Sequence, residues 1–352
     1  MRSNCVKTCV KGGLLLALIA ANSAYSAETP QSVGQAPEKP ADSSTHAVAQ
    51  LFDQPGVLTP RGTTVVEPSL QYSYSSTNRV ALVGYTIVPA VVVGLVDVQT
   101  VNRKTFIGAV TARRGLTNRF EVEAKLPFVR RSDDSVSRPL GAGSDQDQAF
   151  NATGSGLGDI EFGARYQLNE PGTAGPYYVA GLRVKTRTGE SPFDVDYVTG
   201  STAIQSLQKT LPTGSGFYGV QPSLSVIYPS DPAVFFGGIN YMWNKSRNVN
   251  KNILDQHYGN VEPGDSAGFN FGMGMAINEK AGFSLGYEHT YIAKTKIEGV
   301  VSPSSTSVQM ASLLMGFSYR VNPKSSVNLS LGAGLTRDTP DTQITLRVPI
   351  SF

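Results

Sequence analysis

The chain has 352 residues, of which 40% are hydrophobic and 16% charged, and its formal net charge at pH 7 is +3. Its mean hydropathy is slightly negative, which excludes a bundle of membrane-spanning helices. Its 30 basic residues nearly balance its 27 acidic residues, so a nucleic-acid-binding role lacks electrostatic support.

Residues 1–26 are predicted to form a secretory signal peptide. Three basic residues within residues 2–11 precede an apolar core at residues 13–21, and Ala24-Tyr25-Ser26 fits a cleavage site. We expect cleavage before Ala27 or directly after it. Both cysteines leave with the signal, so the mature chain is expected to hold no disulfide and no thiolate metal site. Its basic and acidic residues then number 27 each.

Residues 27–60 are predicted to form a short periplasmic segment. Residues 27–50 hold few large apolar side chains and many Pro, Ala, Ser and Gln residues, a composition typical of a flexible linker. From about Arg61 onward the pattern changes, and we assign residues 61–352 to one membrane domain.

This domain consists of segments in which apolar and polar residues alternate over roughly ten positions. Side chains of a strand point to opposite faces, so each segment offers one face to lipid and one to water. The pattern predicts an all-β fold, a transmembrane antiparallel up-and-down β-barrel of about 12 strands. The predicted strands run over residues 66–74, 106–113, 120–128, 160–168, 178–187, 218–228, 235–243, 269–277, 283–291, 311–320, 327–335 and 344–352.

The connections between these strands alternate in length, as in outer-membrane barrels with short periplasmic turns and long extracellular loops. Only the last connection, residues 336–341, is short where a long one is expected. Short connections are predicted at 115–118, 169–175, 229–232, 278–280 and 322–325. Long connections are predicted at about 76–101, 132–157, 189–216, 247–265 and 294–307.

Aromatic residues gather at both ends of the predicted strands, which is typical of rings anchored at two membrane interfaces. Those near the short connections are Tyr166, Tyr178, Tyr228, Tyr319 and Phe352. Those near the long connections are Tyr74, Phe128, Tyr218, Trp243 and Tyr291.

Residues 80–98 depart from the alternation, because this stretch is nearly uncharged. Its length favours a transmembrane helix. Its many β-branched residues and Pro89 oppose a helix, and we favour an extended hairpin that rises above the first two strands or folds over the mouth. Its apolar character then suits an oligomer contact or a lid that dips into lipid.

The sequence shows no catalytic, cofactor-binding or metal-binding motif. It has three histidines without ligand spacing, and no serine stands at a nucleophile elbow. Gly154-Ser155-Gly156-Leu157-Gly158 superficially resembles a phosphate loop, but no lysine follows and no strand–loop–helix context surrounds it. We interpret this run as a flexible loop entering the fourth strand, and we expect neither enzymatic activity nor a cofactor.

The predicted lumen has two unlike sides. Inward positions on the strands at 269–277 and 283–291 are mostly small, whereas those on the third to fifth strands carry charges of both signs. Small side chains favour a water-filled or ligand-passing lumen, and pairing of the mixed charges favours a sealed one. The candidate lumen-lining residues are Arg113, Glu121, Glu123, Lys125, Asp159, Glu161, Arg165, Arg183, Lys185, Arg187, Glu288 and Arg347.

The last strand carries a pattern for insertion into the outer membrane. Leu346, Val348, Ile350 and Phe352 fall on its outward face, so Arg347 is expected to face the lumen. A terminal aromatic residue at the membrane rim resembles the signal by which outer-membrane barrels are recognised. We therefore expect the barrel-assembly machinery and outer-membrane lipid as partners, and the bacterial outer membrane as the location.

Six segments of the chain carry a resemblance to known proteins: LFDQPGVLTP (51–60), VEPSLQYSY (66–74), NRFEVEAK (118–125), GDIE (158–161), KTRTG (185–189) and YPSDPAVFF (228–236). They resemble a family of outer-membrane barrels labelled as phenol meta-pathway (MetA-pathway) proteins or transporters. Within it, the chain is most similar to the barrel of the functional-amyloid (Fap) secretion channel.

The resemblance implies a twelve-stranded barrel, assembled as a trimer, whose pore is occluded by a segment just before the first strand. In this chain that segment is about residues 47–60. The amyloid channel also carries a long periplasmic coiled-coil region ahead of its barrel, whereas the linker of this chain is short and lacks heptads.

We expect an outer-membrane channel that passes cargo or solutes. Export related to functional-amyloid secretion, with an amyloid subunit as partner, is the first hypothesis. Uptake of small, aromatic solutes is the second, and a structural or adhesive barrel without conductance is the third. No nucleic-acid partner is expected.

Overall fold

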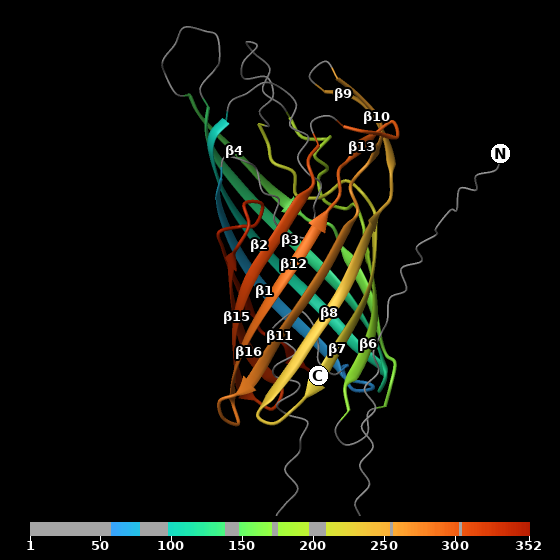
Figure 1. Ribbon diagram of the computed structural model, residues 1–352, viewed down its shortest axis with the longest axis vertical. Helices are drawn as coiled ribbons and strands as arrows, with labels where there is room; N and C mark the ends of the chain where they lie inside the picture. Colours follow the sequence, from blue (N-terminus) through green and yellow to red (C-terminus); the bar gives the residue numbers. More distant parts are fainter. Residues whose placement is uncertain are drawn as a thin grey trace, which may run out of the picture. The chain divides into compact units, whose positions relative to one another are not determined.

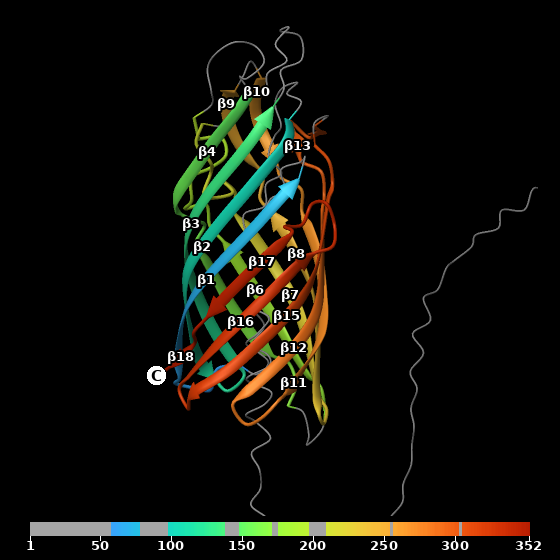
Figure 2. The ribbon, with the colours of Figure 1, turned by 90° about the vertical axis from the view of Figure 1, so that its left-hand side faces the viewer.

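The computed structural model describes residues 58–77, 98–137, 148–170, 175–196, 209–253, 256–302 and 305–352, which form a closed antiparallel β-barrel (Figures 1 and 2). The predicted signal peptide, the linker up to residue 57 and the apolar stretch up to residue 97 lie outside the described residues. Among the residues described, no helix is long and apolar enough to cross a membrane.

Fourteen strands make up the barrel sheet, and two pairs of them continue one another. β4 and β5 both pair with β3, and β17 and β18 both pair with β1, so the barrel has twelve strands as predicted. Since β1 pairs with β2 along its other edge, its pairing with β17 and β18 closes the ring. The bounds are β1 Thr64–Thr77, β2 Val98–Thr117, β3 Phe120–Ser137, β4 Gln148–Leu157, β5 Glu161–Gln167, β6 Tyr177–Lys185, β7 Gly219–Pro229, β8 Ala233–Asn244, β11 Ser266–Ala276, β12 Ala281–Ile292, β15 Val308–Asn322, β16 Ser325–Gly334, β17 Thr342–Arg347 and β18 Ile350–Ser351.

Alternating side chains give the barrel an apolar outside and a polar inside. On β3, Leu126 and Phe128 are 48% and 52% exposed, whereas Glu121 on the opposite face is 1% exposed. The outward row of the last strand ends on Phe352, whose backbone N–H donates to the Thr64 carbonyl at 2.8 Å. An apolar outer surface of this extent requires lipid around it, which confirms the predicted location in the outer membrane.

Aromatic rings stand outward at both ends of the barrel strands. Near the short connections the exposed rings are Tyr166, Tyr178, Tyr228, Tyr319 and Phe352. Near the long connections they are Phe128, Tyr218, Tyr241, Trp243 and Tyr291. Two such levels mark the two membrane–water interfaces.

Connection lengths alternate around the barrel. Residues 118–119, 230–232 and 323–324 join strands at one end, whereas residues 186–218 join β6 to β7 at the other. By the usual arrangement of outer-membrane barrels, the first end is periplasmic and the second extracellular.

β2, β3 and β4 extend farther on the extracellular side than predicted. β2 has 20 residues and β3 has 18, and both β3 and β4 run into residues 132–157, so the loop predicted there is wrong. In this region Arg103 pairs with Asp133 on the inside and Lys104 with Asp134 on the outside. Charged side chains occupy both faces here, so the apolar alternation ends although the backbone pairing of the strands continues.

Two long connections contain strands of their own, although the sequence pattern predicted them as loops. β9 (Arg247–Ile253), β10 (Gln256–Glu262), β13 (Lys296–Ile297) and β14 (Val300–Val301) form a second sheet in the order β14-β13-β10-β9. Figure 1 shows β9, β10 and β13 at the extracellular end of the barrel. We refer to these four strands as the extracellular sheet.

Candidate functional site in the barrel lumen

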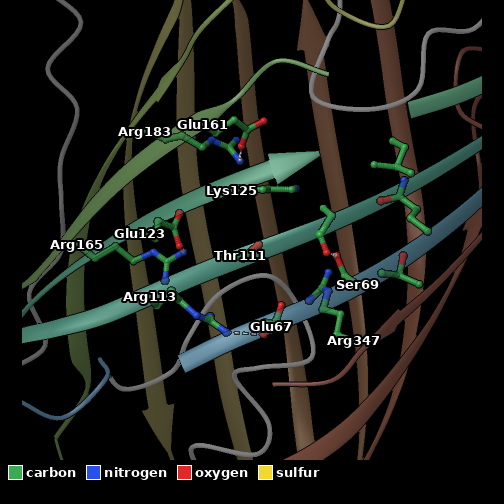
Figure 3. Close-up of a pocket in the computed structure, with 14 residues that line it drawn as sticks. Glu67, Ser69, Thr111, Arg113, Glu123, Lys125, Glu161, Arg165, Arg183 and Arg347 are labelled. Carbon is green, nitrogen blue, oxygen red and sulfur yellow. Dashed lines mark hydrogen bonds and ion pairs between the residues drawn. The ribbon is translucent and has the colours of Figure 1, made fainter. Parts of the chain in front are cut away.

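A polar recess opens into the lumen from the wall formed by β1, β2, β3, β5, β6 and β17 (Figure 3). We refer to it as the charged recess. It contains about 660 Å³ of empty space, part of which is open lumen. Five cationic and three anionic side chains line it, so the formal charge of the lining is +2. These side chains are Glu67, Arg113, Glu123, Lys125, Glu161, Arg165, Arg183 and Arg347.

Arg165 of β5 forms the central ion pairs of this wall. Its guanidinium donates to Glu121 and to Glu123 of β3, each at 2.7 Å. The strand register places Glu121 opposite Arg165 and Glu123 opposite Gly163. A Cβ at Gly163 would lie 2.6 Å from the Glu123 side chain, so this glycine leaves the space that the second carboxylate occupies.

Two further arginines hold the other glutamates of the charged recess. Arg113 of β2 pairs with Glu67 of β1, and each side chain is 8% exposed. Arg183 of β6 donates to Glu161 of β5 at 3.4 Å and also to Gln221 of β7. The recess therefore presents a largely fixed array of charges, because charge-assisted bonds hold three of its arginines and all three of its glutamates.

At the extracellular end, residues 209–217 fold against the lumen wall, and we refer to them as the inner segment. The carboxylate of Asp159 accepts hydrogen bonds from the N–H of Ser215 at 2.8 Å and from its hydroxyl at 2.6 Å. It also accepts the N–H of Gly189 at 3.0 Å. Residues 211–217 are all buried. A carboxylate that accepts three bonds is a strong anchor for this segment.

Glycines of β4 make room for the inner segment. By alternation Gly154 faces the lumen, and a Cβ there would lie 2.0 Å from the carbonyl oxygen of Leu211. The N–H of Leu211 donates to the carbonyl of Thr153 at 3.0 Å. The interpretation of residues 154–158 as a flexible loop is therefore wrong, because this run belongs to β4 as far as Leu157 and its glycines allow close packing.

The connection that carries the inner segment also packs against the extracellular sheet. The rings of Phe193 and Phe217 meet edge to face with centroids 5.9 Å apart, and Phe193 lies 5.8 Å from the ring of Tyr258. Lys251 of β9 donates to the carbonyl of Phe193 at 3.0 Å. The buried members of this cluster are Phe193, Phe217, Val249, Ile253, Tyr258 and Val261. The inner segment is thus held both by the barrel wall and by the extracellular sheet.

The wall of the lumen opposite the charged recess is built of small residues. On β11 and β12 glycine or serine occupies most inward positions, and these positions pair across the two strands. The residues are Gly268, Gly272, Gly274, Gly282, Ser284 and Gly286. Because these residues are small, the width of the lumen depends mainly on the side chains of the charged recess.

An apolar cluster lies on the inner face of β6, β7 and β8 toward the periplasmic end. Ile227 is 2% exposed and Val234 is 7% exposed, while their neighbours Tyr228 and Phe235 point outward. The cluster consists of Tyr177, Ile227, Val234 and Phe236, and we refer to it as the lumen apolar patch.

The chain passes along the lumen wall before it enters β1. Leu58 is 1% exposed, and the N–H of Thr59 donates to the carboxylate of Glu121 at 2.8 Å. Gly115 of β2 permits this approach, since a Cβ there would lie 2.2 Å from the Thr59 carbonyl oxygen. Glu121 therefore binds both the backbone of Thr59, just before β1, and the guanidinium of Arg165.

Most of the residues predicted to line the lumen lie in or beside the charged recess. Asp159 and Lys185, each 2% exposed, are buried beside the inner segment and the recess wall. Glu288 is exposed and lies on the inward side of β12, outside the recess. Those in the charged recess are Arg113, Glu123, Lys125, Glu161, Arg165, Arg183 and Arg347, with Glu121 bound behind Arg165.

Arg187 lies elsewhere than predicted. β6 ends at Lys185, so the alternation of inward and outward side chains along this strand does not extend to Arg187. Its guanidinium carbon lies 5.6 Å from the ring centre of Tyr218, and its side chain is exposed. Glu67 and Gln221 were not among the candidates, although their positions on the inward face of β1 and β7 would have identified them.

The closed barrel, its apolar outside and its polar lumen define an outer-membrane channel. Residues 70–352 match the family described as "Putative MetA-pathway of phenol degradation", and the chain belongs to that family. This agrees with the family part of the resemblance. It does not single out the functional-amyloid secretion channel.

Solved structures of similar fold are outer-membrane barrels. The COG4313 outer membrane channel from Pseudomonas putida F1 is 17% identical with a TM-score of 0.55, over 84% of this chain and 97% of that chain. The CymD monoaromatic hydrocarbon channel is 13% identical with a TM-score of 0.40, over 83% and 88%. The translocator domain of autotransporter NalP from Neisseria meningitidis is 9% identical with a TM-score of 0.44, over 84% and 89%. At these identities the likeness concerns the fold alone.

Proposed function

We propose that this protein is an uptake channel for small solutes, aromatic compounds among them. The observation that carries the proposal is the two-sided lumen, with the charged recess on one wall and small residues and the lumen apolar patch on others. A solute with a polar group and an apolar ring finds a suitable surface for each part. The family description, which refers to phenol degradation, supports the same class of solute.

Export related to functional-amyloid secretion has weaker support. A polypeptide cargo requires an unobstructed lumen, whereas Asp159 anchors the inner segment at the extracellular end. Leu58 and Thr59 lie against the wall at the periplasmic side. Neither the charged recess nor the family description points to a polypeptide.

We also propose that residues 47–60 narrow the periplasmic end of the pore. Only residues 58–60 of this range are described. Support comes from the burial of Leu58 and from the hydrogen bond between Thr59 and Glu121.

Single-channel recording in a planar bilayer tests the proposed function. The folded state of the purified barrel is first verified by its altered mobility on an unheated gel. We expect a steady conductance that small aromatic solutes interrupt and sugars of similar size do not. No current from a correctly folded barrel would remove both the uptake and the export hypotheses, and would favour a structural or adhesive barrel.

A further inference from the structure

We infer that the charged recess binds the carboxylate of aromatic acids as they cross the channel, so that the preferred solute is an organic anion that carries a ring. This inference rests on the proposed function and narrows its class of solute. It depends on three observations: the excess of cations over carboxylates in the recess, the incomplete hydrogen bonding of the Arg113 guanidinium, and the position of the lumen apolar patch.

The charge of the recess favours an anion. Its three glutamates are each engaged by an arginine from a neighbouring strand, and Glu121, which Arg165 also engages, reduces the excess of cations over carboxylates at this wall from two to one. A cleft of one net sign between walls of low polarity raises the local concentration of the opposite ion. A carboxylate that enters the lumen is therefore attracted to this wall.

Arg113 retains donor capacity at the recess. The residue is 7% exposed, and its Nη2 donates to Glu67. Its Nε is buried and has no hydrogen-bond partner among the described residues. A buried donor without an acceptor is unfavourable, and a guanidinium matches a carboxylate in geometry. An acid that enters the recess meets the side chain of Arg113 in its lining.

The lumen apolar patch adjoins the recess wall, because β6 carries both Arg183 of the recess and Tyr177 of the patch. The rest of the patch lies on β7 and β8, the next two strands of the ring. Glu67 and Phe236 each lie three residues from the periplasmic end of their strand, and therefore near one level of the lumen. An aromatic acid that reaches this level finds cations on one part of the wall and the Phe236 ring on a neighbouring part.

The test uses the full-length protein in planar bilayers, with benzoate as the probe. Benzyl alcohol has the same ring without the charge, and acetate has the carboxylate without the ring. We expect benzoate to halve the open-channel current at a concentration about tenfold lower than either of the others, because only benzoate engages both the charged recess and the lumen apolar patch.

Three variants locate the effect. Arg347→Gln should raise the half-blocking concentration of benzoate about tenfold and shift the reversal potential in a KCl gradient toward cation preference. Arg113→Gln combined with Glu67→Gln removes a pair without leaving a buried charge, and should weaken the block with little change in reversal potential. Lys104→Gln, on the outer face of β2, is the matched control and should change neither quantity.

The outcomes separate the two levels of the proposal. Equal block by benzoate and benzyl alcohol, or an unchanged block in Arg347→Gln, would overturn the inference and leave the uptake channel standing. Absence of current from the folded wild-type protein would overturn the proposed function itself, and the inference with it.

Discussion

Asp159 and Ser215 lie 56 positions apart in sequence, yet the carboxylate of Asp159 accepts both the N–H and the hydroxyl of Ser215, at 2.8 and 2.6 Å. Asp159 stands in the interruption between β4 and β5. There its side chain reaches the inner segment rather than a neighbouring strand. This carboxylate is therefore one of the contacts that hold the β6–β7 connection within the lumen.

Replacing Asp159 by Asn should release the inner segment. The amide presents N–H groups where the structure has donors from Ser215 and Gly189, and charge-assisted hydrogen bonds of this kind contribute about 2 kcal/mol. We expect a larger or more strongly fluctuating single-channel current. Asp194→Asn, which removes an exposed ion pair with Lys251, is the control and should resemble the wild type. A wild-type current from Asp159→Asn would show that the segment does not limit the pore.

The close packing at Gly154 gives a second prediction. Gly154→Ala would place a Cβ 2.0 Å from the Leu211 carbonyl oxygen, and we expect a loss of about 1–3 kcal/mol in the stability of this contact. Limited proteolysis after Lys209 should then become faster. Gly108→Ala is the matched control, because no atom of the described chain lies within 4 Å of the position that its Cβ would take in the barrel wall. Equal cleavage rates in both variants would contradict the packing argument.

The ion pairs of Arg165 should be important for stability. Arg165→Met would leave Glu121, which is 1% exposed, and Glu123 without their main partner, and breaking a buried pair costs about 3–5 kcal/mol. Urea unfolding in detergent, followed by gel mobility, measures the change. Lys296→Met removes an exposed pair with Glu262 and should cost at most about 1 kcal/mol. Similar midpoints for the two variants would argue against a buried network.

Deletion of residues 47–60 should raise the conductance if this segment narrows the pore. Thr59→Pro is a smaller change, which removes the N–H that Glu121 accepts along with the Thr59 side chain, and we expect an intermediate increase. Single-channel recording of both variants provides the measurement. Identical currents with and without the segment would refute its role in the pore.

Phe352→Asp should impair outer-membrane insertion far more than folding in detergent. Phe352 is 70% exposed on the outer face at the periplasmic rim, where a charged residue costs about 0–1 kcal/mol in folding. Loss of the terminal aromatic residue should instead reduce recognition by the assembly machinery. Ser351→Asp, one residue earlier and facing inward, is the control. Equal outer-membrane amounts of Phe352→Asp and wild type would contradict the prediction.

The fold class, the location and the number of barrel strands could all be predicted from the sequence. Alternation with period two is a local property, and lipid on one side and water on the other impose it on every strand. The outward positions of Leu126 and Phe128 and the inward positions of Glu121 and Glu123 follow from it directly. So does the inward position of Arg347 once the terminal Phe352 is placed outward.

The segment that lies within the lumen and the pairing of its charges could not be predicted in the same way. Beyond the membrane both faces of β2 and β3 are polar, so no period remains to reveal the strands there. The contact of Gly154 with Leu211 and the bonds of Asp159 to Ser215 join residues that no local pattern relates. Arg165 reaches two glutamates because Gly163 leaves the space beside it. These features depend on contacts between segments that lie far apart in the sequence, and such contacts leave no period along the chain.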